Sequence, residues 1–214
     1  MSNIDELNQK WQQCWTDRSL VVEIDLLFER LVNAYSKSDR YYHNLNHISH
    51  VLTTIELFDL ELQDPVAVKL AAWFHDFVYN PQSSDNEVQS AELAKELLIE
   101  LNVSTELIDR IQQLIFATQG HQIDPDDADR CIFLDADLAI LGTDPTQYQD
   151  YARSIRQEYS WVSDVEYKLG RTKVLESFLQ RDRLYCTDLL FAELESIARI
   201  NMKQEIAELL GYVG

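Results

Sequence analysis

Residues that interrupt regular structure are scarce in this chain, which has five glycines and four prolines among 214 residues. Neither a repeat nor a low-complexity linker is visible, so the composition marks no boundary between domains. The length suffices for one sizeable domain with a hydrophobic core and is marginally short for two. We therefore expect a single domain over residues 1–214.

Positive charge is also scarce, because 18 lysines and arginines stand against 37 acidic residues and the net charge is −19. Nucleic acids and anionic membranes are held by clustered lysine and arginine side chains and are repelled by a field of this sign. The charge therefore excludes a nucleic-acid polymer or an anionic membrane as partner. A small substrate fits the composition better.

Cysteines and long apolar runs are few as well. Cys14, Cys131 and Cys186 are an odd number of cysteines without the spacing of a metal site, so we expect reduced thiols and a cytoplasmic protein. The sequence contains no apolar run of ~20 residues and no cleavable apolar segment near its start. We expect neither a membrane span nor secretion by a standard signal.

Helical periodicity is what the chain has in abundance. Its hydrophobic content of 46% and charged content of 26% are ordinary for a globular protein. Apolar residues recur at the spacing of amphipathic helices along most of its length, which predicts an all-α fold. The expected helices cover residues 4–15, 20–35, 47–62, 65–79, 85–101, 104–118, 127–141, 145–159, 164–180 and 186–210.

One pair of polar residues, His75 and Asp76, directly follows the apolar run 66–74. A buried charge needs a partner, and a divalent cation would supply one for both side chains. Successive side chains on a helix point roughly 100° apart, so both can reach one ion. The alternative is a histidine that ends a helix beside a capping aspartate, since short motifs also arise by chance.

Two other segments carry the same kind of polar residue in apolar surroundings. His43, His47 and His50 are three of the five histidines, and His47 shares a helix face with the apolar residues around it, so one or two of the three can be ligands. Asp135 and Asp137 lie in a strongly hydrophobic stretch, where both cannot face the core.

The order of these residues resembles that of the HD superfamily of metal-dependent phosphohydrolases, which show a histidine, then a His-Asp pair, then a distant aspartate. The resemblance implies an all-α, HD-type helical bundle in which His47, His75, Asp76 and Asp135 bind the metal. His47 is preferred to His43 because members of this superfamily commonly show an apolar residue four positions after the histidine, and Val51 stands at that position. The resemblance covers a catalytic core of about 40–185. More narrowly, the chain is similar to a group of uncharacterised bacterial HD hydrolases in segments 42–47, 73–79, 85–87, 117–121 and 134–138.

Two imidazoles and two carboxylates form a mixed nitrogen and oxygen shell, which suits manganese, iron, cobalt, nickel or zinc better than calcium and also allows magnesium. Four protein ligands leave two positions of an octahedral ion for water or substrate. Such an ion lowers the pKa of bound water towards ~7 and polarises a phosphoryl oxygen. We expect one divalent ion, because a second site in HD proteins usually takes two further histidines and only His121 lies in the relevant interval.

The remaining candidate residues act on the substrate. Asp76 and Glu87 are the expected catalytic residues, with Glu87 as general acid or base; its alternative role is that of an ordinary acid at a helix start. The expected substrate contacts are His43, His121, Lys168 and Arg171. For the two cations the alternative is pairing with neighbouring acids, and for His121 a solvent-facing loop.

Together these features predict an enzyme, a metal-dependent hydrolase of a small phosphate ester such as a nucleotide or a related metabolite. The alternative is a regulatory HD domain that binds the metal and senses a ligand without turnover. A plain helical interaction protein would leave the buried carboxylates unexplained. The apolar helix at 189–210 is expected to pack against the N-terminal helices, although it can also form a dimer interface, so both a monomer and a homodimer remain open.

Overall fold

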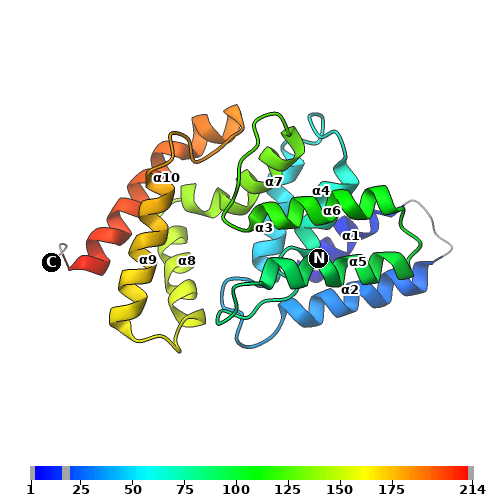
Figure 1. Cartoon of the computed structure of the whole chain (residues 1–214), viewed down its shortest axis with the longest axis horizontal. Coiled ribbons are helices and arrows are strands. Elements are labelled where there is room, and N and C mark those ends of the chain that lie inside the picture. Colours follow the sequence, from blue (N-terminus) through cyan, green and yellow to red (C-terminus); the bar gives the residue numbers. More distant parts are fainter. Residues whose placement is uncertain (1–2, 16–19, 212–214) are drawn as a thin grey trace. The chain divides into compact units, whose positions relative to one another are not determined.

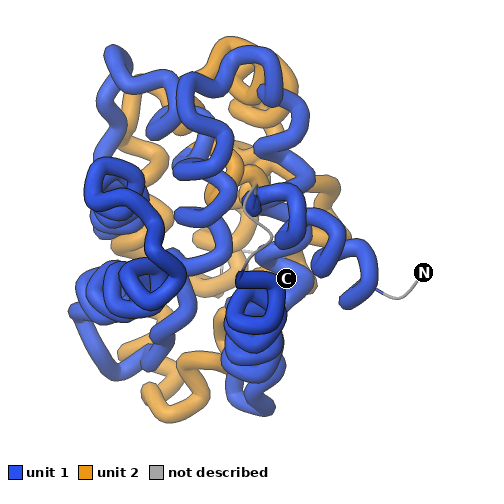
Figure 2. The backbone as a smooth tube through the Cα atoms, turned by 90° about the vertical axis from the view of Figure 1, so that its right-hand side faces the viewer, with its two compact units in different colours: residues 1–134 blue, residues 135–214 orange. Residues whose placement is uncertain are grey.

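The computed structural model describes residues 3–15 and 20–211, and it confirms the all-α prediction. Ten α-helices and one 3-10 helix follow one another, and the described residues include no β-strand (Figure 1). The chain forms two compact units, residues 1–134 and residues 135–214, which Figure 2 distinguishes by colour. No described helix is long and apolar enough to cross a membrane.

Unit 1 is built around α4, whose buried residues run almost without interruption along its length. Helices α3, α5 and α6 all contact α4, and α5 also packs on α6. The helices of this unit are α1 (Asn3–Gln12), α2 (Val21–Tyr35), α3 (Leu45–Glu56), α4 (Pro65–Phe74), α5 (Asn86–Glu100), α6 (Thr105–Thr118) and the first part of α7 (Ala128–Leu138).

The start of α4 is fixed by two carboxylates. The Asp64 side chain caps the helix by accepting from the backbone N–H of Ala67 at 2.9 Å, and Pro65 takes the first helical position. The buried Asp129 carboxylate accepts from the backbone N–H groups of Gln63 and Asp64 at 2.7 and 2.9 Å. These bonds hold the loop before α4 and so set where the helix begins.

The N-terminal helices pack on the same core. Trp11 of α1 is fully buried, and its ring meets Trp73 of α4 edge-on with 5.6 Å between centroids. Phe28 of α2 packs against both tryptophans. The indole N–H of Trp11 donates to the carbonyl of Ile24 at 3.0 Å, so this large side chain is buried with its polar atom satisfied.

Unit 2 centres on the long helix α10, which contacts the three other elements of the unit. Gly142 of the neighbouring 3-10 helix lets the backbone lie close to α10, because a Cβ at this position would lie 2.5 Å from the Cβ of Leu194. Beside it, the Asn201 amide donates to the carbonyls of Leu141 and Thr143 at 3.0 and 2.9 Å. The elements are the 3-10 helix η1 (Ala139–Gly142), α8 (Pro145–Glu158), α9 (Asp164–Leu179) and α10 (Asp188–Leu210).

A buried ion pair joins α9 to α10. The Arg171 guanidinium donates from Nε and Nη2 to the two carboxylate oxygens of Glu205, at 2.7 and 3.0 Å. Its Nη1 donates to the hydroxyl of Tyr151 at 3.2 Å, and the Tyr148 hydroxyl donates to Glu205 at 2.5 Å. A two-pronged pair of this kind satisfies both charges within the unit.

The predicted and observed helices agree in number and order, but α4 ends earlier than its apolar pattern suggests. The pattern extends to residue 79, whereas the helix ends at Phe74. The carbonyls of Asp76 and Phe77 accept hydrogen bonds from the Arg40 side chain, and the backbone N–H of Val78 donates to the Ser90 hydroxyl. These bonds to side chains replace helical ones, so His75 and Asp76 lie at a helix end.

The expectation of three reduced cysteines is wrong for two of them. Cys131 and Cys186 are disulfide-bonded, while Cys14 is a free and buried thiol whose pKa is raised by burial to about 12. The cytoplasmic location stays a prediction without the support that three thiols would have given it.

The Arg171–Glu205 pair generates a test of stability. Arg171→Met leaves the Glu205 carboxylate buried without a cation, so the free energy of unfolding in urea should fall by about 3–5 kcal/mol. The double variant Arg171→Met/Glu205→Leu removes both charges and should recover part of that loss. A single variant as stable as the unaltered chain would contradict a structural role for this arginine.

Candidate metal centre

His75 is the best-defined side chain of the candidate site. It caps the C-terminal end of α4 and is 2% exposed. Its Nδ1 lies 2.9 Å from the carbonyl of Ala72. A carbonyl can only accept, so Nδ1 carries the proton and the Nε2 of the neutral ring presents a lone pair. The ring is thereby oriented as metal-binding histidines usually are.

His47 faces His75 from α3. The Asn44 side chain caps this helix by accepting from the backbone N–H of Asn46 at 2.8 Å, which places His47 on the buried face in the first turn. Its Nδ1 lies 3.1 Å from the Tyr42 hydroxyl, and its Nε2 lies 3.1 Å from the Nε2 of His75. Both outer nitrogens therefore contact protein oxygens and both inner nitrogens meet.

The Asp76 carboxylate joins the two rings. Its Oδ2 lies 3.1 Å from the Nε2 of His75 and 3.6 Å from that of His47. Burial by itself raises the pKa of Asp76. When His75, His43 and His47 are protonated, their charges and the hydrogen bond from His75 outweigh burial and lower this pKa. The side chain, 18% exposed, is thus an ionised carboxylate at the border between interior and solvent.

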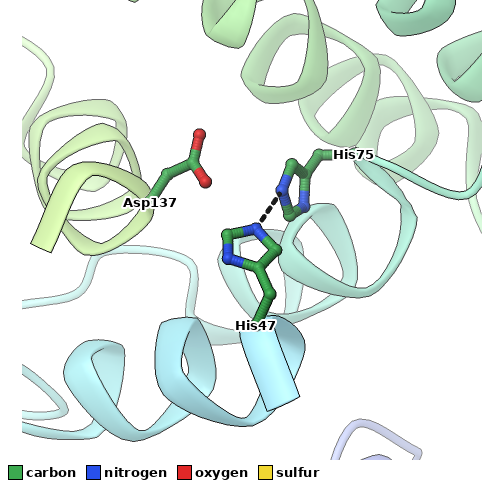
Figure 3. Close-up of side chains that lie close together, drawn as sticks. All are labelled: His47, His75 and Asp137. Atoms are coloured by element: carbon green, nitrogen blue, oxygen red, sulfur yellow. Dashed lines mark hydrogen bonds between the residues drawn. The ribbon is translucent and has the colours of Figure 1, made fainter. Parts of the chain in front are cut away.

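Asp137 is the carboxylate that α7 contributes. The ring of Phe133, in the first part of α7, packs edge-on against that of His75 with 5.7 Å between centroids. Asp137 follows Phe133 by four residues and so shares its helix face. One ligand atom each from His47, His75 and Asp137 lies within 4.8 Å of the other two, and Figure 3 shows these three side chains.

The spacing of the two histidine nitrogens suits a metal ion. Two nitrogens bound at ~2.1 Å to one ion lie about 3.0 Å apart at a right angle and about 3.4 Å apart at a tetrahedral angle. The observed separation of 3.1 Å falls within that interval. The group can therefore hold a metal ion, and its nitrogen and oxygen donors fit a first-row divalent cation.

Asp135, the predicted fourth ligand, is engaged elsewhere. Its carboxylate accepts from the backbone N–H groups of Cys186 and Thr187 at 2.8 and 2.7 Å, and from the Thr187 hydroxyl at 2.7 Å. Burial raises the pKa of Asp135, and these donors oppose that effect. Residues two apart on a helix point roughly 200° apart. The structure accordingly places Asp137, and not Asp135, with the histidines.

Two other predicted site residues, His43 and Glu87, lie in unit 1. The His43 ring stacks on Tyr79 with 4.3 Å between centroids, and its centroid is 5.8 Å from that of His47. Glu87 is half-buried in the first turn of α5, after a loop closed by hydrogen bonds between Asn80 and Asn86. The structure places His43 beside the candidate ligands, and the roles of both residues stay predictions.

The remaining predicted substrate contacts differ in their surroundings. His121 lies in the turn after α6 with a φ of 49°, in the left-handed region. Lys168 is exposed on α9, and Arg171 is buried with its guanidinium bonded to Glu205 and Tyr151. The guanidinium of Arg171 is therefore engaged within the protein, and the predicted roles of His121 and Lys168 stay predictions.

Sequence reasoning overlooked two residues that orient the site. Tyr42 contacts the outer nitrogen of His47, and Arg40 binds the backbone beside the His-Asp pair. Both fall inside or next to the motif around His47. An arginine and a tyrosine flanking predicted metal ligands are the signal that could have indicated them.

The two aspartates of α7 can be separated by experiment. Asp137→Ala removes a candidate ligand, so the Mn²⁺ affinity of this variant in calorimetric titration should fall strongly. Loss of a residue that merely orients a ligand costs about 10–100-fold, and loss of the ligand itself should cost more. Asp135→Ala leaves three donors without their acceptor, so it should lower the free energy of unfolding by at least about 2 kcal/mol. The reverse pattern would restore Asp135 as the ligand.

Comparison with known proteins found no matching family model, no matching curated protein and no matching solved structure. The helical fold with its group of two histidines and an aspartate is compatible with an HD domain. The HD resemblance therefore rests on the motifs and on the geometry of these side chains.

Proposed function

We propose that this protein is a metal-dependent hydrolase of a small phosphate ester, in which His47, His75, Asp76 and Asp137 hold one divalent ion. The observation that carries the proposal is the arrangement of the two rings. Both outer nitrogens contact protein oxygens, while the two Nε2 atoms lie 3.1 Å apart beside the Asp76 carboxylate. Two buried ring nitrogens and a carboxylate gathered at one point are a donor set that favours a cation.

A divalent ion bound there supplies a Lewis acid for a phosphoryl oxygen and makes nearby water more acidic. The chain's own residues do the rest of the work. Ala72 and Tyr42 fix the two rings, so the ligand atoms are oriented before any ion binds. The carboxylate of Asp76, adjacent to the Nε2 of His75, would balance part of the ion's charge.

Substrate contacts in the proposal come from His43 and Glu87. The His43 ring lies beside the candidate ligands and stacks on the ring of Tyr79. Its nitrogens can form hydrogen bonds with a phosphate oxygen. Glu87 is the proposed proton donor or acceptor for the ester, a role that requires it to come within reach of the bound substrate. With Arg171 occupied by Glu205, phosphate binding depends mainly on the ion and on His43.

The occupied arginine also favours a second candidate function. A catalytic site for phosphate esters commonly presents an arginine fork to the phosphate, and the arginine predicted for that task is paired inside unit 2. A metal-containing regulatory domain that senses a ligand needs no such fork. Turnover distinguishes the two functions.

The proposal predicts turnover on a phosphoester panel assayed with Mn²⁺, Fe²⁺, Co²⁺, Ni²⁺, Zn²⁺ or Mg²⁺. Asp76→Ala should lose both activity and bound metal, since Asp76 is a ligand, while its far-UV circular dichroism stays helical. Glu87→Gln should lower kcat by about 100-fold or more and keep its metal content. Glu96→Gln, an exposed position on the same helix, is the matched control and should behave as the unaltered chain.

Each failure has a distinct meaning. Full turnover by Glu87→Gln would remove this residue from acid–base catalysis. Metal binding without turnover on any ester would favour the sensing function. A chain that binds none of these ions would refute both functions.

A further inference from the structure

We propose that Arg40 is a positioning residue that holds the two ligand-bearing segments of the metal centre in register. This inference rests on the proposed function. Arg40 is 6% exposed and lies in the loop before α3. Its guanidinium donates only to backbone carbonyls in the described contacts: Nη1 to His43 at 3.1 Å and to Asp76 at 2.7 Å, and Nη2 to Phe77 at 2.8 Å.

These three carbonyls belong to two segments far apart in the sequence. His43 lies four residues before His47, near the start of α3, whereas Asp76 is itself a candidate ligand and follows His75 at the end of α4. Arg40 is 36 residues from Asp76 and 37 from Phe77. One side chain therefore joins the start of the helix that carries His47 to the end of the helix that precedes His75.

The loop that carries Arg40 is itself fixed. The backbone N–H of Arg40 donates to the carbonyl of Lys37 at 3.1 Å. The Asn44 amide donates to the carbonyl of Tyr41 at 2.8 Å, while its oxygen caps α3. The position of Arg40 is thereby transmitted to the first turn of α3, where His47 lies.

Two aromatic rings hold the plane of the guanidinium. Its Cζ lies 4.9 Å from the ring centroid of Tyr35 and 5.5 Å from that of Tyr79. The Tyr35 hydroxyl donates to the carbonyl of Trp73 at 2.9 Å, so this ring is attached to the same end of α4. Such cation–π contacts restrict how far the fork can tilt away from its carbonyls.

Charge and shape both favour arginine here. Two of the three carbonyls lie just beyond the C-terminal end of α4, where a cation is favourable. The planar fork reaches three carbonyls at once, and a lysine ammonium, a point charge on a flexible stem, cannot reproduce that geometry. Without the fork, the segments that carry His47 and His75 lose the hydrogen bonds through which Arg40 joins them.

The test compares Arg40→Lys with the matched control Arg110→Lys. Arg110 lies in the same unit and makes a similar two-pronged contact, to Asp127 at 2.7 and 2.6 Å. In calorimetric titration, Arg40→Lys should bind Mn²⁺ about 10–100-fold more weakly than the unaltered chain. Its visible absorption spectrum with Co²⁺, which reports ligand geometry, should change. Arg110→Lys should keep both the affinity and the spectrum, whatever it does to thermal stability.

Tyr79→Leu provides a second variant if Arg40→Lys does not fold. It removes one of the two rings and leaves the three hydrogen bonds, so Mn²⁺ affinity should fall by about two- to fivefold. Metal affinity is measured in place of turnover, because Tyr79 also contacts His43.

The outcomes separate this inference from the proposed function. If the unaltered chain binds Mn²⁺ and the folded Arg40→Lys variant binds it equally well, with the same Co²⁺ spectrum, Arg40 serves stability alone and the positioning role is refuted. With Arg40→Lys unfolded, unchanged affinity in Tyr79→Leu refutes it likewise. If the unaltered chain binds no metal, the proposed function falls, and the inference falls with it.

Discussion

Two buried imidazoles, one on α3 and one at the end of α4, meet beside a partly exposed carboxylate, and the surrounding part of unit 1 must satisfy their polar atoms. His75 and Asp76 follow a helix whose other residues are almost all apolar. Polar side chains in such surroundings cost free energy unless every donor and acceptor has a partner. The carbonyl of Ala72 and the hydroxyl of Tyr42 are the partners of the two outer ring nitrogens. The two inner nitrogens lie 3.1 Å apart, beside the Asp76 carboxylate.

The hydrogen bonds of the outer nitrogens determine which nitrogen of each ring faces the candidate metal site. A histidine whose Nδ1 is bonded to a carbonyl can present only Nε2 to a ligand, and the ring cannot turn without losing that bond. The same hydrogen bonds that stabilise the fold therefore orient the candidate ligands. The carbonyls of Asp76 and Phe77, just beyond the end of α4, accept from the Arg40 guanidinium in place of helical N–H groups. Fold and site share one set of interactions.

Much of this could be predicted from the sequence, because it depends on local patterns. Periodicity predicted a helix over 20–35, and α2 covers Val21–Tyr35. The clustered histidines indicated His47, and the His-Asp pair after an apolar run indicated His75. Contacts between distant residues could not be predicted in this way. Asp135 and Asp137 look alike in a hydrophobic stretch, and only the amides of residues 186 and 187 decide which carboxylate is occupied.

The same limit explains the two arginines. Arg171 looked like a phosphate ligand beside a glycine, but its partner, Glu205, lies 34 residues away and no local signal connects them. The shortened α4 has the same cause, since its end is set by an arginine 36 residues earlier. Sequence patterns show which side chains are polar in an apolar setting. They do not show which of those polar groups the fold itself has already used.

The use of cations inside the fold bears on what the site can bind. With 18 basic residues against 37 acidic ones, positive charge is limited, and part of it serves the interior. Arg40 is bonded to carbonyls, Arg171 to Glu205, and Arg199 to Glu195 and the carbonyl of Leu179. Cations bonded in this way cannot turn to a substrate without breaking the fold's own contacts. An anionic substrate must therefore obtain most of its compensating charge at the histidine–aspartate group itself, which favours a small ester with its phosphate at the ion over a polyanion that needs an extended basic surface.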